Sequence, residues 1–311
     1  MKKSSPQFLL LCTVALLCVA ATADDPHPHR PILVPSRPVI ERVPLSVIDP
    51  IDVTITEFGD TLVADAGGKM LFRVTTDGIA NVLGKNLTGI SRVVDSRQLG
   101  PHALLTDQKS SRVLRFTDSG MQQTVINFAF RAFGLAIDPD NNLITSSGKT
   151  GIIYHVDDEN TLTRLVQLSE PVLDLATDRL GNVFVLLQSG QVISVTGKDA
   201  SAPVGFLPKG TTRIKIHPDD YAVGLTTGEQ RPILNRINKT SKPLQFAGTA
   251  MGTSAFAFDG LGNLVLTNPD LRAVTRVKSR FVVNCSHPNC DHPVHMILTP
   301  NAVPQHRRRS F

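Results

Sequence analysis

The chain has 311 residues and a formal net charge of +5, with 5% aromatic residues and no tryptophan. Five positive charges stand near its ends, namely Lys2, Lys3, Arg307, Arg308 and Arg309. The remaining sequence is close to neutral and offers few aromatic stacking platforms, which excludes a basic nucleic-acid-binding surface.

Residues 1–23 are predicted to be a signal peptide. Two lysines precede an apolar stretch from Phe8 to Ala21, and the small residues Ala21 and Ala23 stand at the positions that a signal peptidase reads. Cleavage before Asp24 would give an exported product, periplasmic or extracellular, with no membrane span. A retained membrane anchor is the alternative.

Residues 24–46 are predicted to be a proline-rich leader. Five prolines fall between Asp24 and Arg42, and proline disfavours helix in the residue before it, so an extended segment is expected. The stretch RPVIERV at 37–43 is the candidate for a strand that closes the fold that follows.

Residues 47–282 contain a repeat with a step of about 40 residues. Strand-like runs with alternating apolar residues are separated by turn-forming clusters, as in FGLAIDPDNNLITSS at 133–147. The start of the second strand-like run recurs at Leu62, Ala103, Leu143, Val183, Ala222 and Leu264, with steps of 41, 40, 40, 39 and 42. Four short strands in each of six such units predict an all-β fold, a six-bladed β-propeller of four-stranded antiparallel blades.

The repeated units resemble a known propeller family. GLAIDPDNNLITSSGKTGIIYHV at 134–156 and DTLVADAGGKMLFRV at 60–74 look like NHL-repeat blades, and more loosely like the blades of gluconolactonases and virginiamycin lyases. The resemblance covers most of the mature chain and implies the propeller fold. A tryptophan-aspartate type of propeller is disfavoured because the chain has no tryptophan.

The first strand of each unit is expected to line the central channel, with alternate residues on its two faces. The bulkier face, expected to pack between blades, carries Val53, Arg92, Leu135, Leu175, Ile214 and Phe256. The other face carries one ring of Asp52, Ser91, Gly134, Asp174, Arg213 and Ala255, and a second ring of Thr54, Val93, Ala136, Ala176, Lys215 and Ala257.

The two rings supply the candidate ligand-binding residues, which are Asp52, Ser91, Asp174, Arg213 and Lys215. Charges are rare inside a fold unless they are paired or functional. One interpretation is a polar pocket in which Arg213 and Lys215 hold an anionic group and the aspartates bind polar groups or a cation. The alternative is an internal ion-pair network between the fourth and fifth units.

No catalytic residues are predicted. A gluconolactonase-like site, as the resemblance would imply, needs a glutamate and several asparagine or aspartate ligands around a divalent cation. The rings offer two aspartates on opposite sides, with Glu170 near the second. A virginiamycin-lyase-like site needs a channel histidine, whereas His102 and His217 are expected at turns or on the surface.

Residues 283–311 form a tail that is rich in cysteine and histidine and then basic. It contains Cys285, His287, Cys290, His292 and His295. Two cysteines and two histidines can complete a tetrahedral zinc or copper site. In an exported protein, a disulfide between Cys285 and Cys290 is the simpler expectation.

The sequence therefore predicts an exported binding or protein-interaction module that works through its channel mouth and loops. Its partner would be a protein or a small polar ligand, with neither nucleic acid nor a membrane span. No cofactor is predicted, and the sequence leaves open whether a divalent cation binds. The alternatives are a metal-dependent, lactonase-like hydrolase and a protein that handles metal through the tail.

Overall fold

The computed structural model describes residues 31–35, 38–96, 98–107, 109–157, 159–228, 231–237, 244–278, 281–285 and 296–298. It describes only the backbone of 31–35, 281–285 and 296–298. Two compact units are present, one formed by residues 37–279 and the other by residues 1–36 with 280–311.

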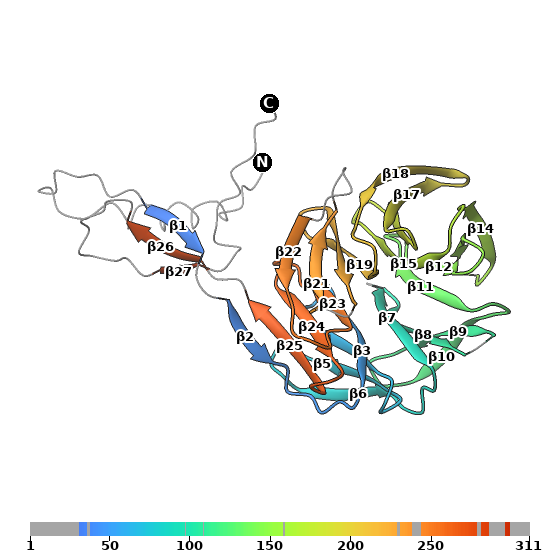
Figure 1. The fold of residues 1–311 in the computed structure, drawn as a ribbon. Coiled ribbons are helices and arrows are strands. Elements are labelled where there is room, and N and C mark those ends of the chain that lie inside the picture. The colour runs from blue at the N-terminus through green and yellow to red at the C-terminus, as the bar shows by residue number, and fades with distance from the viewer. Residues whose placement is uncertain are drawn as a thin grey trace, which may run out of the picture. The chain divides into compact units, whose positions relative to one another are not determined.

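Residues 37–279 form a β-propeller of six four-stranded antiparallel blades, as predicted (Figure 1). The innermost strands are β3 (Pro50–Ile55), β7 (Ile90–Ser96), β11 (Ala132–Ile137), β15 (Val172–Thr177), β19 (Thr211–His217) and β23 (Ala255–Phe258). The second strands are β4 (Thr61–Asp65), β8 (Gly100–Thr106), β12 (Leu143–Ser147), β16 (Val183–Leu187), β20 (Tyr221–Thr226) and β24 (Leu264–Asn268). The third strands are β5 (Met70–Val74), β9 (Ser111–Phe116), β13 (Ile152–Val156), β17 (Gln191–Gly197), β21 (Ile233–Arg236) and β25 (Ala273–Lys278). The outer strands are β6 (Ala80–Gly84), β10 (Gln122–Phe128), β14 (Leu162–Gln167), β18 (Ala200–Phe206), β22 (Leu244–Gly248) and β2 (Val39–Arg42).

The ring is closed by a strand from the N-terminal side of the propeller. β2 pairs with β25, so residues 39–42 complete the sixth blade, and Figure 1 shows the orange strands of that blade beside the blue strands of the first. Val43 and Val47, which follow β2, are buried in the cluster between these two blades. Residues 39–43 therefore belong to the propeller.

The turns between innermost and second strands follow from their sequence. The Asp138 carboxylate accepts the backbone N–H groups of Asp140 and Asn142 at 3.0 and 2.9 Å. Asn141 has a φ of 68°, a left-handed value that favours asparagine or glycine, and Gly181 occupies the same place in the fourth blade with a φ of 85°. The hairpin turn predicted from PDNN is confirmed.

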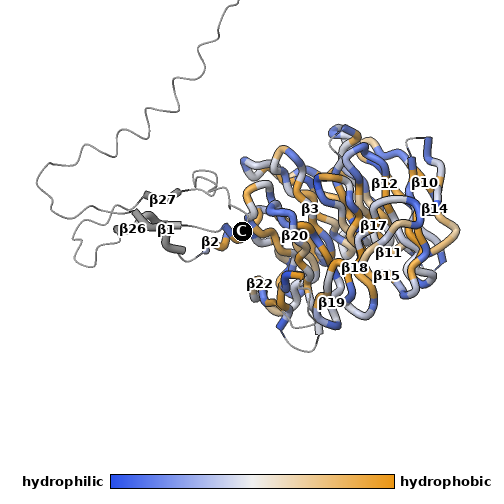
Figure 2. Tube along the Cα trace, turned by 90° about the horizontal axis from the view of Figure 1, so that it is seen from above, coloured by the Kyte–Doolittle hydropathy of each residue, from blue (hydrophilic) through white to orange (hydrophobic). Residues whose placement is uncertain are grey.

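The core is divided among the interfaces between blades. Each pair of neighbouring blades, including the sixth and the first, encloses its own cluster of buried apolar side chains. Figure 2 shows the corresponding apolar stretches in orange along the strands. Radial packing of this kind buries both faces of each sheet and leaves the loops at the two ends of the channel for recognition.

The other unit contains a three-stranded sheet in the order β1 (Pro31–Pro35), β26 (Phe281–Cys285) and β27 (Met296–Leu298). In the part of the chain that the structure describes, there is no helix that could cross a membrane. The proposed signal peptide lies outside the described residues.

Candidate functional site

A ring of six side chains occupies equivalent positions on the innermost strands. In the first, second, fourth and fifth blades, a register shift between the innermost and second strands immediately precedes this position, and in the third blade the shift spans it. From the first blade to the sixth, the ring is Asp52, Arg92, Gly134, Asp174, Arg213 and Ala255. Aspartate, arginine and a small residue therefore occur in this order twice around the channel.

The predicted alignment of the second blade is wrong by one residue. The Val93 N–H donates to Asp52 at 2.8 Å, just as the Ile214 N–H donates to Asp174 at 3.0 Å, so Val93 corresponds to Ile214. Arg92 therefore belongs to the ring, and it was wrongly placed on the face between blades. The reason is that Ile90 was matched to Ile51, whereas the strand pairing makes Ile90 equivalent to Pro50 and makes Ser91, the bulge residue, equivalent to Ile51. Ser91 hydrogen-bonds Thr106 at 3.0 Å.

The four charges of the ring form a buried cluster. Arg92 Nε donates to Asp174 Oδ1 at 3.3 Å, which gives an ion pair between the second and fourth blades, whereas the sequence suggested the fourth and fifth. The pKa of Arg213 is lowered to about 10 by burial and by the charge of Arg92, against the opposing effect of Asp52 and Asp174. This arrangement leaves Arg213 Nε and Asp52 Oδ1 buried without a hydrogen-bond partner among the described residues.

Two cavities that share lining residues lie beyond this cluster, toward the turns that join innermost and second strands. We call this the turn end of the channel. The inner cavity, of about 190 Å³, is lined by the six side chains two positions after the ring, namely Thr54, Val94, Ala136, Ala176, Lys215 and Ala257. The outer cavity, of about 300 Å³, forms the mouth. Both are lined by Asp95, Ile137, Thr177, Ile216 and Phe258.

The mouth is acidic. Asp95, Asp138, Asp178, Asp220 and Asp259 line the outer cavity, against a single arginine, Arg179. His217 also lines the mouth and stacks on Tyr221 with ring centroids 4.5 Å apart. Burial lowers the pKa of His217, so the neutral imidazole is favoured near neutral pH. The aspartates therefore determine the charge of the mouth.

Asp95 is the functional candidate that the sequence analysis missed. It lies at the end of β7, where the other blades carry Ile55, Ile137, Thr177, Ile216 and Phe258. Burial raises its pKa to about 6, although Arg73 and the Glu57 backbone N–H favour the ionised form. The sequence did contain a signal for Asp95, because it is the one carboxylate at a position where the other five blades carry an apolar or neutral residue.

The raised pKa of Asp95 predicts a pH dependence of stability. The folded protein binds this proton more tightly than the unfolded chain, so stability should fall as pH rises from about 4 to about 6. Replacement of Asp95 by asparagine should remove this component and make the variant more stable than the wild type at pH 7. Urea midpoints of both proteins, measured from pH 4 to 7, test this. Parallel pH curves would contradict it.

The other candidates lie apart from the cavities or outside the described residues. His102 was expected at a turn or on the surface, but it is 2% exposed within β8, and burial lowers its pKa to about 4. Glu170 accepts the Ser189 N–H at 3.1 Å. The side chains of Cys285, His287, Cys290, His292 and His295, and with them the predicted disulfide or metal site, lie outside the described residues.

The ring does not fit the cation site that a lactonase-like reaction would need. Asp52 and Asp174 are each bonded to a backbone N–H group, and Asp174 also pairs with Arg92. Among the described residues, no three histidine, cysteine, aspartate or glutamate side chains form a group that could hold a metal ion. A divalent cation therefore finds no set of oxygen ligands there.

Comparison with known proteins gives the fold. No protein-family model matches the chain, and no curated protein sequence matches it. Among solved structures, a gluconolactonase from Xanthomonas campestris is 12% identical with a TM-score of 0.61, covering 81% of this chain and 99% of that one. Virginiamycin B lyase from Staphylococcus aureus is 13% identical with a TM-score of 0.56, covering 78% and 87%. A streptogramin B lyase is 10% identical with a TM-score of 0.58, covering 78% and 98%. The chain therefore shares the six-bladed propeller fold of these lactonase and lyase enzymes, as its repeats suggested.

Proposed function

We propose that this protein is an exported binding module that holds a small polar ligand in the two cavities at the turn end of its channel. The observation that carries the proposal is the combination of Lys215 and Asp95 in one cavity whose walls are otherwise mainly apolar or small. Pockets of this kind, with a few polar groups among apolar ones, are the usual form of small-ligand sites. Because propellers host many activities, the fold itself does not choose the ligand.

Saturation-transfer NMR with a panel of sugars, sugar lactones, amino acids, amines and carboxylic acids tests this proposal. Thr177 lines both cavities, so Thr177→Phe should obstruct them and abolish the signals of compounds that bind the wild type. Thr163→Phe makes the same change on the exposed face of β14 and should retain them. Signals that persist equally in both variants, or a panel with no binders, would refute the proposal.

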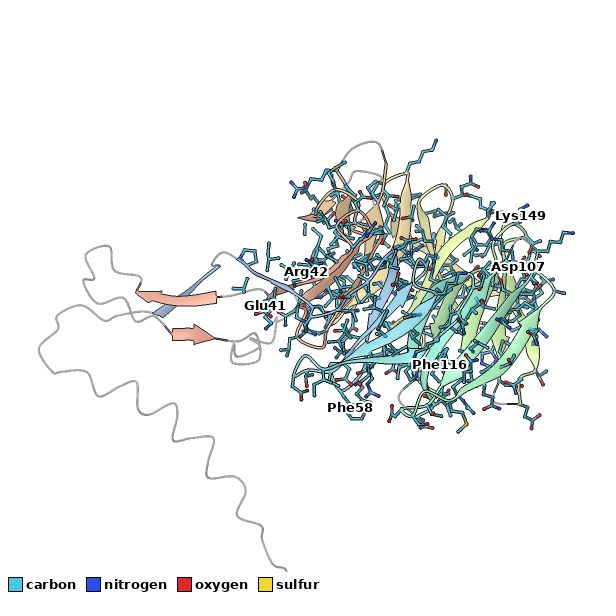
Figure 3. The ribbon with its side chains drawn as sticks, turned by 90° about the horizontal axis from the view of Figure 1, so that it is seen from below. Glu41, Arg42, Phe58, Asp107, Phe116 and Lys149 are labelled. Carbon is cyan, nitrogen blue, oxygen red and sulfur yellow. The ribbon has the colours of Figure 1, made fainter. Side chains whose placement is uncertain are left out.

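A second candidate function, recognition of a protein on the same face, is favoured by an apolar rim. Four turns at the turn end carry an exposed large side chain immediately before a glycine, namely Phe58, Leu99, Leu180 and Leu261, with exposures of 76, 38, 85 and 39%. Figure 3 shows Phe58 at the outer edge of the propeller. With the acidic mouth, this rim fits a segment in which apolar side chains flank a lysine or arginine.

Cross-linking in cells that express the protein tests the second candidate. A double variant, Phe58→Ser with Leu180→Ser, should lose a cross-linked partner that the wild type retains. Leu162→Ser, which removes a leucine that is 39% exposed on β14, should keep it. If the double variant and this control capture the same partners, the rim is not a recognition surface.

A further inference from the structure

The inner cavity holds one unpaired charge of each sign. Lys215 is half-buried and forms neither a hydrogen bond nor an ion pair with any of the described residues. The Asp95 carboxyl accepts the Glu57 backbone N–H and forms no ion pair within the described part of the chain. Both side chains line the inner cavity, and they are not paired with each other. Each charge is therefore available to a ligand.

Apolar side chains line the cavity along with the two charges. Ile137, Ile216 and Phe258 are partly exposed and contribute to its walls, whereas Leu135 and Leu175 are each only 2% exposed. A ligand that reached both charges would therefore pass these three partly exposed apolar side chains. Apolar contact of this kind is favourable, whereas a polar middle would have to lose its hydrogen bonds to water.

The two charges also occupy different depths. Asp95 lines both the mouth and the inner cavity, and the mouth carries four further aspartates. Lys215 lines the inner cavity and does not line the mouth. A positive group is therefore favoured at the outer side, and a negative group is favoured next to Lys215.

We propose that these cavities bind a small zwitterion, with its anionic group beside Lys215, its ammonium group beside Asp95 and a short apolar chain between them. This assignment rests on the proposed function, because it names the class of ligand for the same cavities. It requires that both charges act together, so that a molecule with only one of them binds less tightly.

A series of linear ω-amino acids tests the assignment by calorimetry. The probes are 4-aminobutyrate, 5-aminopentanoate and 6-aminohexanoate, with hexanoate and hexylamine as singly charged controls. At least one ω-amino acid should bind the full chain about tenfold more tightly than either control, which corresponds to the gain from one charged hydrogen bond. Lys215→Met and Asp95→Asn should each remove this advantage.

Matched substitutions control for changes in overall charge. Lys149→Met and Asp107→Asn alter exposed residues in turns between second and third strands, away from the two cavities, and both residues are labelled in Figure 3. These variants should retain the tenfold preference.

Three results would overturn the zwitterion assignment. They are equal binding of zwitterionic and singly charged probes, a preference that survives both Lys215→Met and Asp95→Asn, and no binding of any ω-amino acid. The NMR panel judges the proposed function separately, because a ligand of another class that Thr177→Phe displaces would support channel binding while the zwitterion fails.

Discussion

Replacement of Asp174 by alanine is expected to lower the free energy of unfolding by about 3–5 kcal/mol, the cost of breaking a buried ion pair from one side. Asp174 is 3% exposed and accepts both Arg92 Nε and the Ile214 N–H. Its removal leaves the guanidinium of Arg92, a residue that is 9% exposed, without this partner. Urea denaturation followed by circular dichroism measures the loss.

Asp52 provides a matched control for this experiment because it occupies the equivalent ring position in the first blade. It accepts the Val93 N–H at 2.8 Å but forms no ion pair among the described residues. Asp52→Ala should therefore cost less, about 1–3 kcal/mol. The double variant Arg92→Leu, Asp174→Leu should recover most of the loss, since it removes both charges. Equal losses for the two alanine variants would contradict the proposed role of the ion pair.

Replacement of Phe116 by alanine is expected to cost about 3–5 kcal/mol through lost burial and the cavity left behind. Phe116 is fully buried in the cluster between the first and second blades. Its ring lies against Gly84, where an added Cβ would come within 2.5 Å of Phe116 Cε1, so the packing there is tight. The same urea experiment measures the change.

Phe58 is the control for Phe116, because it is 76% exposed in a turn of the first blade. Figure 3 labels both side chains. Phe58→Ala should change the free energy of unfolding by less than about 0.5 kcal/mol, as is usual for surface substitutions. If Phe116→Ala were equally mild, the interface between these blades would not be the close-packed core that the structure describes.

The propeller could be predicted from the sequence because its signals are local. A turn such as PDNN carries its own side-chain hydrogen bonds, and its repetition every 40 residues requires no knowledge of distant contacts. The stretch RPVIERV at 37–43 was the candidate for the closing strand, and β2 within it pairs with β25 in the structure. Local propensity and repetition therefore identify the blades.

The site was less predictable because it depends on register and on contacts between blades. In Ile90-Ser91-Arg92-Val93-Val94, two adjacent polar residues and two adjacent apolar residues leave two choices of alternation. The pairing with β8 decides between them, and the hydrogen bond from Val93 to Asp52 in another blade is consistent with that register. The raised pKa of Asp95 likewise results from burial against segments that are distant in sequence.

Cysteine labelling tests most directly whether the inner part of the channel is reached from solution through an acidic mouth. The chain without residues 1–23 would carry Cys285→Ser and Cys290→Ser, with Thr177→Cys at the junction of the two cavities or Thr163→Cys on β14. The quantity to compare is the ratio of the labelling rate with a cationic methanethiosulfonate to the rate with an anionic one. This ratio should be about tenfold higher for Thr177→Cys than for Thr163→Cys, as expected for an electrostatically focused cleft. No reaction at position 177, or no preference for the cation, would contradict the account.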